Sequence, residues 1–375
     1  MKNQDLIVFG EDWGALPSST QQLIQHLALT RDVIWVNSIG LRQPKFNRRD
    51  IQRIWQKLLA LNTSTPQHKT TKVAPNFTVI NPATIPAPTS YLARFIARQL
   101  LSYQLKKILK KHRIVDPVLW ISLPTAVDVV GMLGESAVIY YCCDDFDALE
   151  GVDHNTVKIC EDQLLECANL VLTSSEVLTE KLGHHAITIE HGVDYQLFSN
   201  PTNIATDLPD NGNPTAGYYG SIASWVNIEL LQQVISQLPD WNFVFIGEIT
   251  ADVSKLKQFN NVYFLGSRPH HQLPQYSQHW TVSLLPFRHN SQINACNPFK
   301  LREYLAAGRP IISTNFPALT PYSNLVDIVN SPSEMLKALQ RAKDNSYIDP
   351  LKRQAVANET WQVRAQQVAR LMECL

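Results

Sequence analysis

The chain has 375 residues, of which 45% are hydrophobic and 18% charged, a composition that is typical of a globular protein and excludes wholesale disorder. Its formal net charge is zero, but between Leu41 and Arg113 there are fifteen Lys and Arg residues and one acidic residue, Asp50. No apolar run is long enough to span a bilayer, and residues 1–10 lack the pattern of a signal peptide. We therefore expect a cytoplasmic protein, and the length allows two domains.

The cysteine pattern predicts neither a disulfide framework nor a metal site. The six cysteines form no Cys-x-x-Cys pair and no metal-ligating spacing with histidine. We interpret them as reduced structural thiols. They lie at positions 142, 143, 160, 167, 296 and 374.

The chain is predicted to begin with a βαβ unit. A short apolar strand at 5–10 is followed by a loop at 11–17, and Ser18, Ser19 and Thr20 form an N-cap cluster for a helix that ends near Leu29. A second strand is expected at 32–38. The turn after the first strand lacks Gly-x-Gly-x-x-Gly, which disfavours a site for a nicotinamide dinucleotide.

The basic residues fall on two predicted helices, at 51–61 and 91–112. A block of one charge sign indicates an anionic partner, either a phosphate-bearing acceptor or an anionic membrane surface, whereas a pair of solvated helices is the alternative. We favour the partner, because solvated faces usually mix both signs. The second helix also carries an apolar stripe, most of which we expect to lie in the core. The stripe consists of Leu92, Phe95, Ile96, Leu100, Tyr103 and Ile108.

Further strands are predicted at 117–122, 137–143, 170–174 and 187–190, with helices between them, which indicates a doubly wound parallel sheet. Ligands bind at the carboxyl ends of the strands in such sheets. Asp144, Asp145 and Asp147 follow a buried strand, so they could orient an acceptor hydroxyl, take its proton or hold a metal ion. The alternative is that they cap the helix that begins near Asp153. We favour the functional interpretation.

Residues 195–214 are rich in Asn, Pro, Thr and Asp and are predicted to be a linker between domains. A second α/β run follows, with strands at 216–220, 243–247, 262–266, 281–287, 311–314 and 326–329. Gly217 to Ser221 is a strand that runs into a turn of small residues, where backbone amides can approach a phosphate closely.

The segment 297–314 predicts a short helix, a turn and a buried strand. Asn297 is expected to be the N-cap and Pro298 the first helical residue, and Gly308 to end the helix in a left-handed conformation. Lys300 and Glu303 lie three residues apart near the helix N-terminus. This arrangement suits a nucleoside diphosphate, with Lys300 toward the phosphates and Glu303 accepting from the ribose hydroxyls. The alternative is a solvated ion pair.

The run Glu303-Tyr-Leu-Ala-Ala-Gly-Arg-Pro resembles the donor-binding helix of glycosyltransferase family 4, retaining enzymes with the GT-B fold. Glu303 matches the carboxylate that holds the donor ribose in that family. The run His191-Gly-Val-Asp194 resembles the segment that closes the first domain. The chain departs from the family at Ala295, where a second Glu is usual, and at Ser221, where an Arg is usual. Cys143 and Asp144 occupy the region where many members place a His.

The resemblance implies an α/β protein of the GT-B fold, with two doubly wound Rossmann-like domains facing a cleft. An acceptor-binding domain is expected at 1–194, a linker at 195–214, a nucleotide-sugar-binding domain at 215–350, and a C-terminal helix at 351–375 that packs back on the first domain. The donor site is expected to use the following residues: Gly220, Ser221, Arg268, Arg288, Lys300 and Glu303. Asp144, Asp145 and Lys300 are the expected catalytic residues.

The function implied is transfer of a sugar from a nucleotide-diphosphate sugar to a hydroxyl of a glycan or lipid-linked acceptor, in cell-envelope or exopolysaccharide synthesis. No cofactor, no metal ion and no nucleic acid is expected, and peripheral contact with the inner face of an anionic membrane is a further expectation. Two alternatives stay open. One is a nucleotide-sugar epimerase on the same fold, and the other is a non-enzymatic nucleotide- or carbohydrate-binding protein.

Overall fold

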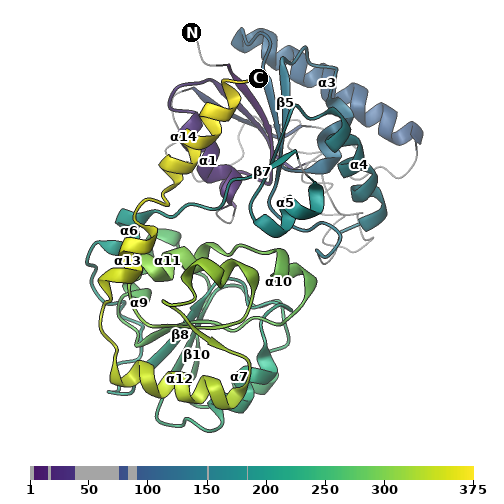
Figure 1. Ribbon diagram of the computed structural model, residues 1–375. Helices are drawn as coiled ribbons and strands as arrows, with labels where there is room; N and C mark the ends of the chain where they lie inside the picture. Colours follow the sequence, from purple (N-terminus) through teal and green to yellow (C-terminus); the bar gives the residue numbers. More distant parts are fainter. Residues whose placement is uncertain (1–3, 16–17, 39–75, 83–90, 150–151, 184) are drawn as a thin grey trace. The chain divides into compact units, whose positions relative to one another are not determined.

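The computed structural model describes residues 4–15, 18–38, 76–82, 91–149, 152–183 and 185–375 (Figure 1). The chain divides into two compact units. Unit 1 contains residues 1–190 and 365–375, and unit 2 contains residues 191–364. The predicted helix at 51–61 lies outside the described residues. Among the described residues, no helix has the length and apolar character needed to cross a membrane.

The described part of unit 1 is built on a parallel sheet of seven strands in the order β3-β2-β1-β4-β5-β6-β7. The strand β1 is internal and pairs on both sides, Leu6 lying opposite Val33 and Val118. The strands are β1 (Leu6–Phe9), β2 (Val33–Val36), β3 (Phe77–Ile80), β4 (Val118–Ile121), β5 (Ala137–Cys142), β6 (Leu170–Thr173) and β7 (Ala186–Thr188).

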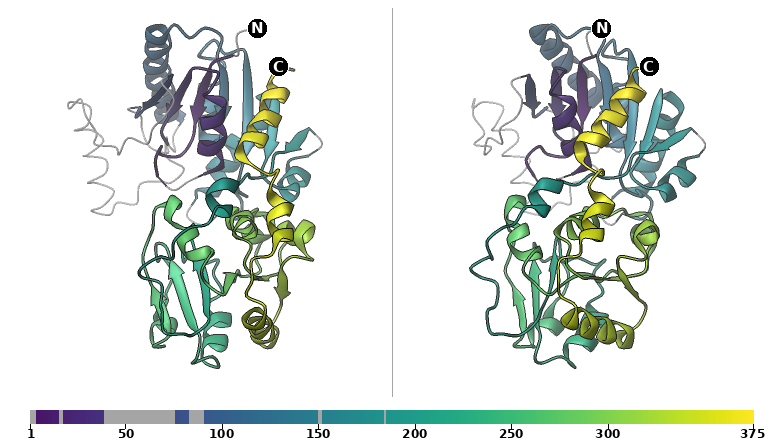
Figure 2. Two further views of the ribbon diagram at one scale, coloured as in Figure 1. Left: turned by 90° about the vertical axis from the view of Figure 1, so that its left-hand side faces the viewer. Right: turned by 60° about the vertical axis from the view of Figure 1, so that its left-hand side comes forward.

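Helices cover both faces of this sheet (Figures 1 and 2). On one face lie α1 (Ser19–Leu27) and the end of α14 (Trp361–Met372), and on the other lie α3 (Tyr91–His112) and α4 (His154–Cys167). The guanidinium of Arg94 on α3 donates to Gln163 on α4 at 3.2 Å, so these two helices are neighbours. The described part of unit 1 also contains η1, a 3₁₀ helix (Pro124–Val129), and α5 (Glu176–Leu182).

Burial on both faces explains why the strands could be found in the sequence. Every residue of β1, β2, β4, β5 and β6 is buried, which gives the continuous apolar runs that are typical of covered parallel strands. The strand β3 was not predicted. Its four residues are only partly buried at the edge of the sheet, and their sequence, Phe-Thr-Val-Ile, is short.

The helix α3 has the predicted bounds, but the prediction of its core face was wrong. The residues that face the core are Ala97, Leu101, Leu105 and Leu109, each at most 7% exposed. Five residues of the predicted apolar stripe are instead exposed to solvent: Leu92, Phe95, Ile96, Leu100 and Tyr103. The sequence did not distinguish the faces because apolar residues occur on both.

Unit 2 is built on a parallel sheet of six strands in the order β10-β9-β8-β11-β12-β13. The strands are β8 (Thr215–Tyr219), β9 (Asn242–Ile246), β10 (Val262–Phe264), β11 (Val282–Leu285), β12 (Ile311–Thr314) and β13 (Asp327–Val329). The helices are α6 (Tyr195–Ser199), α7 (Ile228–Ile235), α8 (Ser254–Lys257), η2 (His270–Gln272), α9 (Pro274–Ser277), α10 (Ser291–Ala295), α11 (Phe299–Ala307), η3 (Pro317–Tyr322), α12 (Pro332–Asp344), α13 (Pro350–Val356) and the start of α14.

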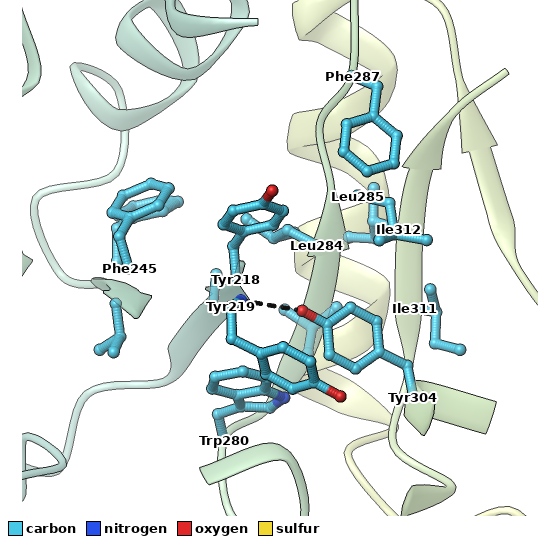
Figure 3. Packing of buried hydrophobic residues seen from close by; sticks show 14 of the residues in the cluster. Tyr218, Tyr219, Phe245, Trp280, Leu284, Leu285, Phe287, Tyr304, Ile311 and Ile312 are labelled. Atoms are coloured by element: carbon cyan, nitrogen blue, oxygen red, sulfur yellow. Dashed lines mark hydrogen bonds between the residues drawn. The ribbon is translucent and has the colours of Figure 1, made fainter. Parts of the chain in front are cut away.

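The core of unit 2 fixes α11 against β8 through aromatic residues (Figure 3). The rings of Tyr219 and Tyr304 meet edge to face with 4.8 Å between their centroids, and Trp280 stacks on Tyr219. The backbone N–H of Tyr219 also donates to the hydroxyl of Tyr304 at 3.1 Å. All three side chains are at most 2% exposed. This packing determines which side chains of α11 reach the end of β8.

The ends of α11 agree with the prediction at one terminus only. Gly308 is the C-cap, in the left-handed conformation with φ 85° and ψ 0°. The N-cap is Pro298 rather than Asn297, so the helix begins one residue later than predicted. The side chain of Asn297 accepts a hydrogen bond from Arg302 at 2.6 Å instead.

Two other segments differ from their predicted form. Residues 195–214, which we expected to be a linker, include α6 and contribute the buried side chains of Phe198 and Leu208 to the core of unit 2. The predicted C-terminal helix is two helices, α13 and α14, with a break at 357–360. Thr360 in this break bridges to Val193, so the break is a point of backbone pairing.

Candidate functional site

The strand order of unit 2 marks one position for a ligand. From β8 the chain proceeds outward through β9 and β10, and then crosses to the other side of β8 to form β11, β12 and β13. Loops separate at such a switch point and leave a crevice at the carboxyl ends of the strands. Gly220 is the first residue after β8, and α11 packs beside this strand through Tyr304. The candidate site is therefore built from Gly220 and the first turns of α11.

Lys300 lies directly over the backbone of Gly220. Gly220 has φ 122°, and a Cβ atom added to it would lie 2.0 Å from Cε and 2.6 Å from Nζ of Lys300. Only glycine permits this approach. The Lys300 ammonium is also 5.9 Å from the centroid of the Tyr218 ring. A cation is thus held where the small-residue turn and the N-terminus of α11 meet, which is a favourable place for a phosphate.

Glu303 lies one turn further along α11, and both of its carboxylate oxygens accept hydrogen bonds. The hydroxyl of Tyr219 donates to Oε2 at 2.7 Å, and Nε2 of His270 lies 2.6 Å from Oε1. Glu303 is 7% exposed. Its orientation is therefore fixed by two side chains from different elements, Tyr219 at the end of β8 and His270 in η2. Each oxygen keeps a lone pair for a further donor such as a ribose hydroxyl.

His270 was not singled out in the sequence. Burial lowers its pKa, but the hydrogen bond to Glu303 and the negative charges of Glu303 and Asp194 outweigh burial and raise the pKa above its usual value. The ring of Phe198 packs against the imidazole edge to face at 5.3 Å. The only sequence signal was its place in the loop that follows β10, 33 residues before Glu303.

Arg268 belongs to the same loop as His270. Its Nη2 lies 2.5 Å from Oδ2 of Asp207, and its Nε donates to the hydroxyl of Tyr276 at 3.1 Å. Asp207 lies in the segment that we expected to be a linker. The ion pair with Asp207 therefore orients Arg268 within the loop that also carries His270.

Arg288 and Ser221 have other contacts. The guanidinium of Arg288 lies 2.5 Å from Glu229 in an exposed ion pair. The carbonyl of Ser221 accepts a hydrogen bond from the hydroxyl of Tyr218 at 3.0 Å. Among the contacts that the described residues make, none joins Arg288 to Lys300 or Glu303. The structure therefore brings together Gly220, Lys300 and Glu303 and gives Arg288 a partner of its own.

The opposite side of α11 is anchored by a buried ion pair. Arg302 is fully buried, and its Nε lies 2.6 Å from Oε2 of Glu359, in the break between α13 and α14. The hydroxyl of Tyr322 also lies within 2.8 Å of both oxygens of Glu359. On α11, Glu303 thus belongs to the candidate site, and the preceding residue, Arg302, belongs to the buried ion pair that anchors the helix.

In unit 1, the Asp144 to Asp147 turn follows β5. Lys181 on α5 bridges Asp145 and Asp147, with its Nζ 2.5 Å and 2.8 Å from their carboxylate oxygens. Asp153 is the residue that caps α4. The Lys181 ammonium thus lies between the two carboxylates, where a bound metal ion would otherwise lie. No group of three or more His, Cys, Asp or Glu side chains suited to a metal ion occurs in the described part of the chain.

Asp144 is not part of this ion pair. Desolvation, followed by the negative charges of Glu11 and Asp145, raises its pKa, although the exposure of the side chain to solvent limits the effect. Of the two carboxylates that we expected to be catalytic, Asp145 is paired with Lys181, whereas Asp144 lies just after β5 and outside that pair.

Comparison with known proteins finds a family model that matches most of unit 2. The family model described as "Glycosyl transferases group 1" matches residues 213–345. The putative teichuronic acid biosynthesis glycosyltransferase TuaH of Bacillus subtilis (strain 168) is 27% identical over 222 residues, which is 53% of this chain and 56% of the relative. The match therefore spans a little over half of that protein's length.

Solved structures resemble nearly the whole chain. Anabaena Alr3699/HepE, in complex with UDP and glucose, has a TM-score of 0.67 at 14% identity and covers 99% of this chain and 100% of that one. An alpha,alpha-trehalose-phosphate synthase (UDP-forming) from Burkholderia vietnamiensis has a TM-score of 0.66 at 12% identity, with 99% and 100% covered. At these identities the likeness concerns the fold. It confirms the predicted GT-B class with two Rossmann-like parallel-sheet units.

Proposed function

We propose that this protein is a glycosyltransferase that moves a sugar from a nucleotide-diphosphate sugar to a hydroxyl of a glycan or lipid-linked acceptor in cell-envelope synthesis. One observation carries the proposal: Lys300 and the doubly hydrogen-bonded Glu303 lie at the switch point of the unit whose sequence matches the group 1 glycosyl transferases. The teichuronic acid role attributed to the Bacillus relative supports the envelope acceptor.

In this proposal unit 2 binds the donor. Lys300, the turn at Gly220 and the N-terminus of α11 bind the diphosphate, and Glu303 accepts from the ribose hydroxyls. As the bond to the sugar breaks, negative charge develops on the leaving diphosphate. Lys300 and the N-terminal amides of α11 stabilise that charge, so they act by electrostatic stabilisation and positioning. Arg268, two residues before His270, is a further candidate for the diphosphate, although its guanidinium is paired with Asp207. Arg288 is also paired, with Glu229, and lies apart from the loop of His270 in the sequence, so it is the weaker candidate.

Unit 1 binds the acceptor. Asp144 follows β5 and carries the raised pKa, so it is the candidate that orients the acceptor hydroxyl or takes its proton. Asp145 acts indirectly in this scheme, because its ion pair with Lys181 orders the turn that presents Asp144. We propose retention of configuration and no requirement for a metal ion, in keeping with the family 4 resemblance.

The test begins with nucleotide binding. The protein is screened against UDP, GDP, ADP and CDP by thermal shift and then by calorimetry, since a ligand at about 100 times its dissociation constant stabilises the native state by about 2.7 kcal/mol. Nucleotide-sugars of the preferred base are then incubated with and without an extract of lipid-linked acceptors. We expect one base to bind and sugar transfer to require the acceptor. Conversion of the donor without acceptor would indicate the epimerase, and binding without turnover would indicate a binding protein.

A further inference from the structure

The helix α3 has two apolar faces, and only one of them is used by the fold. Ala97, Leu101, Leu105 and Leu109 recur every fourth residue and are buried against unit 1. The other face exposes large apolar side chains that would normally be covered. Their exposed fractions are 68% for Leu92, 48% for Phe95, 48% for Ile96, 41% for Leu100 and 70% for Tyr103.

The exposed face continues into a cluster of lysines. At about 3.6 residues per turn, Leu92 and Lys110 are roughly five full turns apart and lie on the same line along the helix. Ile96 and Tyr103 fall within about 40° of that line. Four exposed lysines follow in the C-terminal half: Lys106, Lys107, Lys110 and Lys111. Lys110 lies on the line, Lys106 and Lys107 lie within about 60° of it on either side, and Lys111 lies about 100° from it. The outer face of α3 is therefore apolar in its first half and cationic in its second.

The charge on this face has one sign. The sequence of α3 contains no Asp or Glu. Arg94 does not contribute to the outer charge, because its guanidinium is bound to Asp128 at 2.8 Å on the side of η1. In Figure 1, α3 runs along the outer edge of unit 1. The outer face of α3 therefore has a row of exposed apolar side chains followed by a group of lysines without acidic residues among them. Such a face is complementary to a surface that has an apolar interior and an anionic exterior.

We propose that this outer face of α3 docks on an anionic lipid bilayer. Leu92, Phe95, Ile96, Leu100 and Tyr103 enter the boundary between headgroups and acyl chains, and the four lysines contact anionic headgroups. An acidic protein surface would match the lysines but would need a complementary apolar groove over the first half of the helix. A bilayer provides both chemistries along a straight helix. This inference does not depend on the proposed donor site, because that site lies in unit 2 and α3 belongs to unit 1.

The experiment measures sedimentation of the full chain with vesicles. One set consists of phosphatidylcholine, and the other contains roughly 30% phosphatidylglycerol as the anionic lipid. We expect the wild type to sediment with the anionic vesicles, less so as salt is raised, and weakly with the neutral ones. Failure of the wild type to sediment with anionic vesicles at low salt would overturn the proposal and would leave the face to a protein partner.

Two variants test the two halves of the face. Leu92→Ser, Ile96→Ser and Tyr103→Ser together remove apolar surface from exposed positions, so the fold should be retained. Lys106→Gln, Lys107→Gln, Lys110→Gln and Lys111→Gln together remove the charge. Each variant is expected to lower the partition coefficient on anionic vesicles by about tenfold or more. The serine variant should keep a weak, salt-sensitive association, whereas the glutamine variant should lose its salt dependence.

Matched controls carry the same changes at exposed positions elsewhere. One control is Ile159→Ser, Tyr347→Ser and Leu351→Ser, and the other is Lys158→Gln, Lys255→Gln, Lys257→Gln and Lys337→Gln. Both should bind vesicles as the wild type does, and an equal loss in the controls would refute the assignment to α3. Nucleotide affinity by calorimetry should be unchanged in all four variants. Vesicle binding without any nucleotide binding would contradict the proposed function and leave this inference standing.

Discussion

The imidazole Nε2 of His270 lies 2.6 Å from Oε1 of Glu303, and the two residues come from the loop after β10 and from α11. Tyr219 donates to the second oxygen. The carboxylate is therefore oriented before any ligand arrives, and such preorganisation lowers the entropy lost on binding. His270 and Tyr219 act as positioning residues for Glu303 in the proposed donor site.

Glu303→Gln is expected to weaken binding of the preferred nucleoside diphosphate by about 1.5–3 kcal/mol, because charge-assisted hydrogen bonds to the ribose are lost. The amide fits the same space, but its NH₂ group cannot accept from Tyr219 or His270. Calorimetry measures the affinity, and circular dichroism checks the fold. Glu229→Gln, at the exposed pair with Arg288, is the matched control and should bind as the wild type does. Equal affinities in all three proteins would remove Glu303 from the site.

The His270–Glu303 pair should also make stability depend on pH. The folded pKa of His270 is raised above the unfolded value of about 6.5, because Glu303 outweighs burial. Its contribution is therefore fully present below pH 6.5 and is lost as the pH rises through the folded pKa. Urea unfolding across this range should show a decline that is smaller in His270→Gln. His271→Gln, at the exposed neighbouring position, should retain the decline.

Gly220→Ala should destabilise unit 2 and weaken nucleotide binding together. The residue has φ 122°, and the new methyl group would meet Lys300 Cε at 2.0 Å. The backbone strain alone costs on the order of 1–3 kcal/mol. Gly212→Ala is a control for strain without a clash, because φ is 79° there and nothing lies within 4 Å of the added atom. In a double-mutant cycle, Lys300→Ala should relieve part of the Gly220→Ala effect on unfolding. Strict additivity of the two changes would contradict the contact.

Glu359→Ala should lower the free energy of unfolding by about 3 kcal/mol, since it removes the carboxylate partner of the fully buried Arg302. The expected value is at the lower end of the usual range, because the Glu359 side chain is 21% exposed and Asn297 also accepts from Arg302. Urea unfolding measures the change. Glu180→Ala, an exposed position on α5, is the control and should be close to neutral. A loss as small as that of the control would show that the pair does not anchor α11.

Sugar transfer is expected to continue in the presence of a chelator. Lys181 bridges Asp145 and Asp147, so an ammonium group already lies between these two carboxylates. The assay compares turnover before and after EDTA treatment and after addition of Mg²⁺ or Mn²⁺. Loss of turnover that either metal restores would overturn the metal-independent scheme and the assignment of this turn to the acceptor.

Except for the edge strand β3, the sequence by itself determined the alternation of strands and helices, because buried parallel strands leave continuous apolar runs and helix ends leave local signals such as Gly308. It also predicted that Gly220 follows a strand and that Lys300 and Glu303 lie in the first turns of a helix, and the structure has them at these positions. These features depend on residues that are neighbours in the sequence, so a local pattern is enough to predict them.

Only the tertiary structure decided the partners of those residues. His270 reaches Glu303, Glu359 reaches Arg302, and Lys181 reaches Asp145 from positions 33, 57 and 36 residues away. The structure likewise decided which apolar face of α3 is buried. Such choices depend on how the sheets fold and on which surfaces meet. A local pattern of residues contains no information about a partner that is distant in the chain.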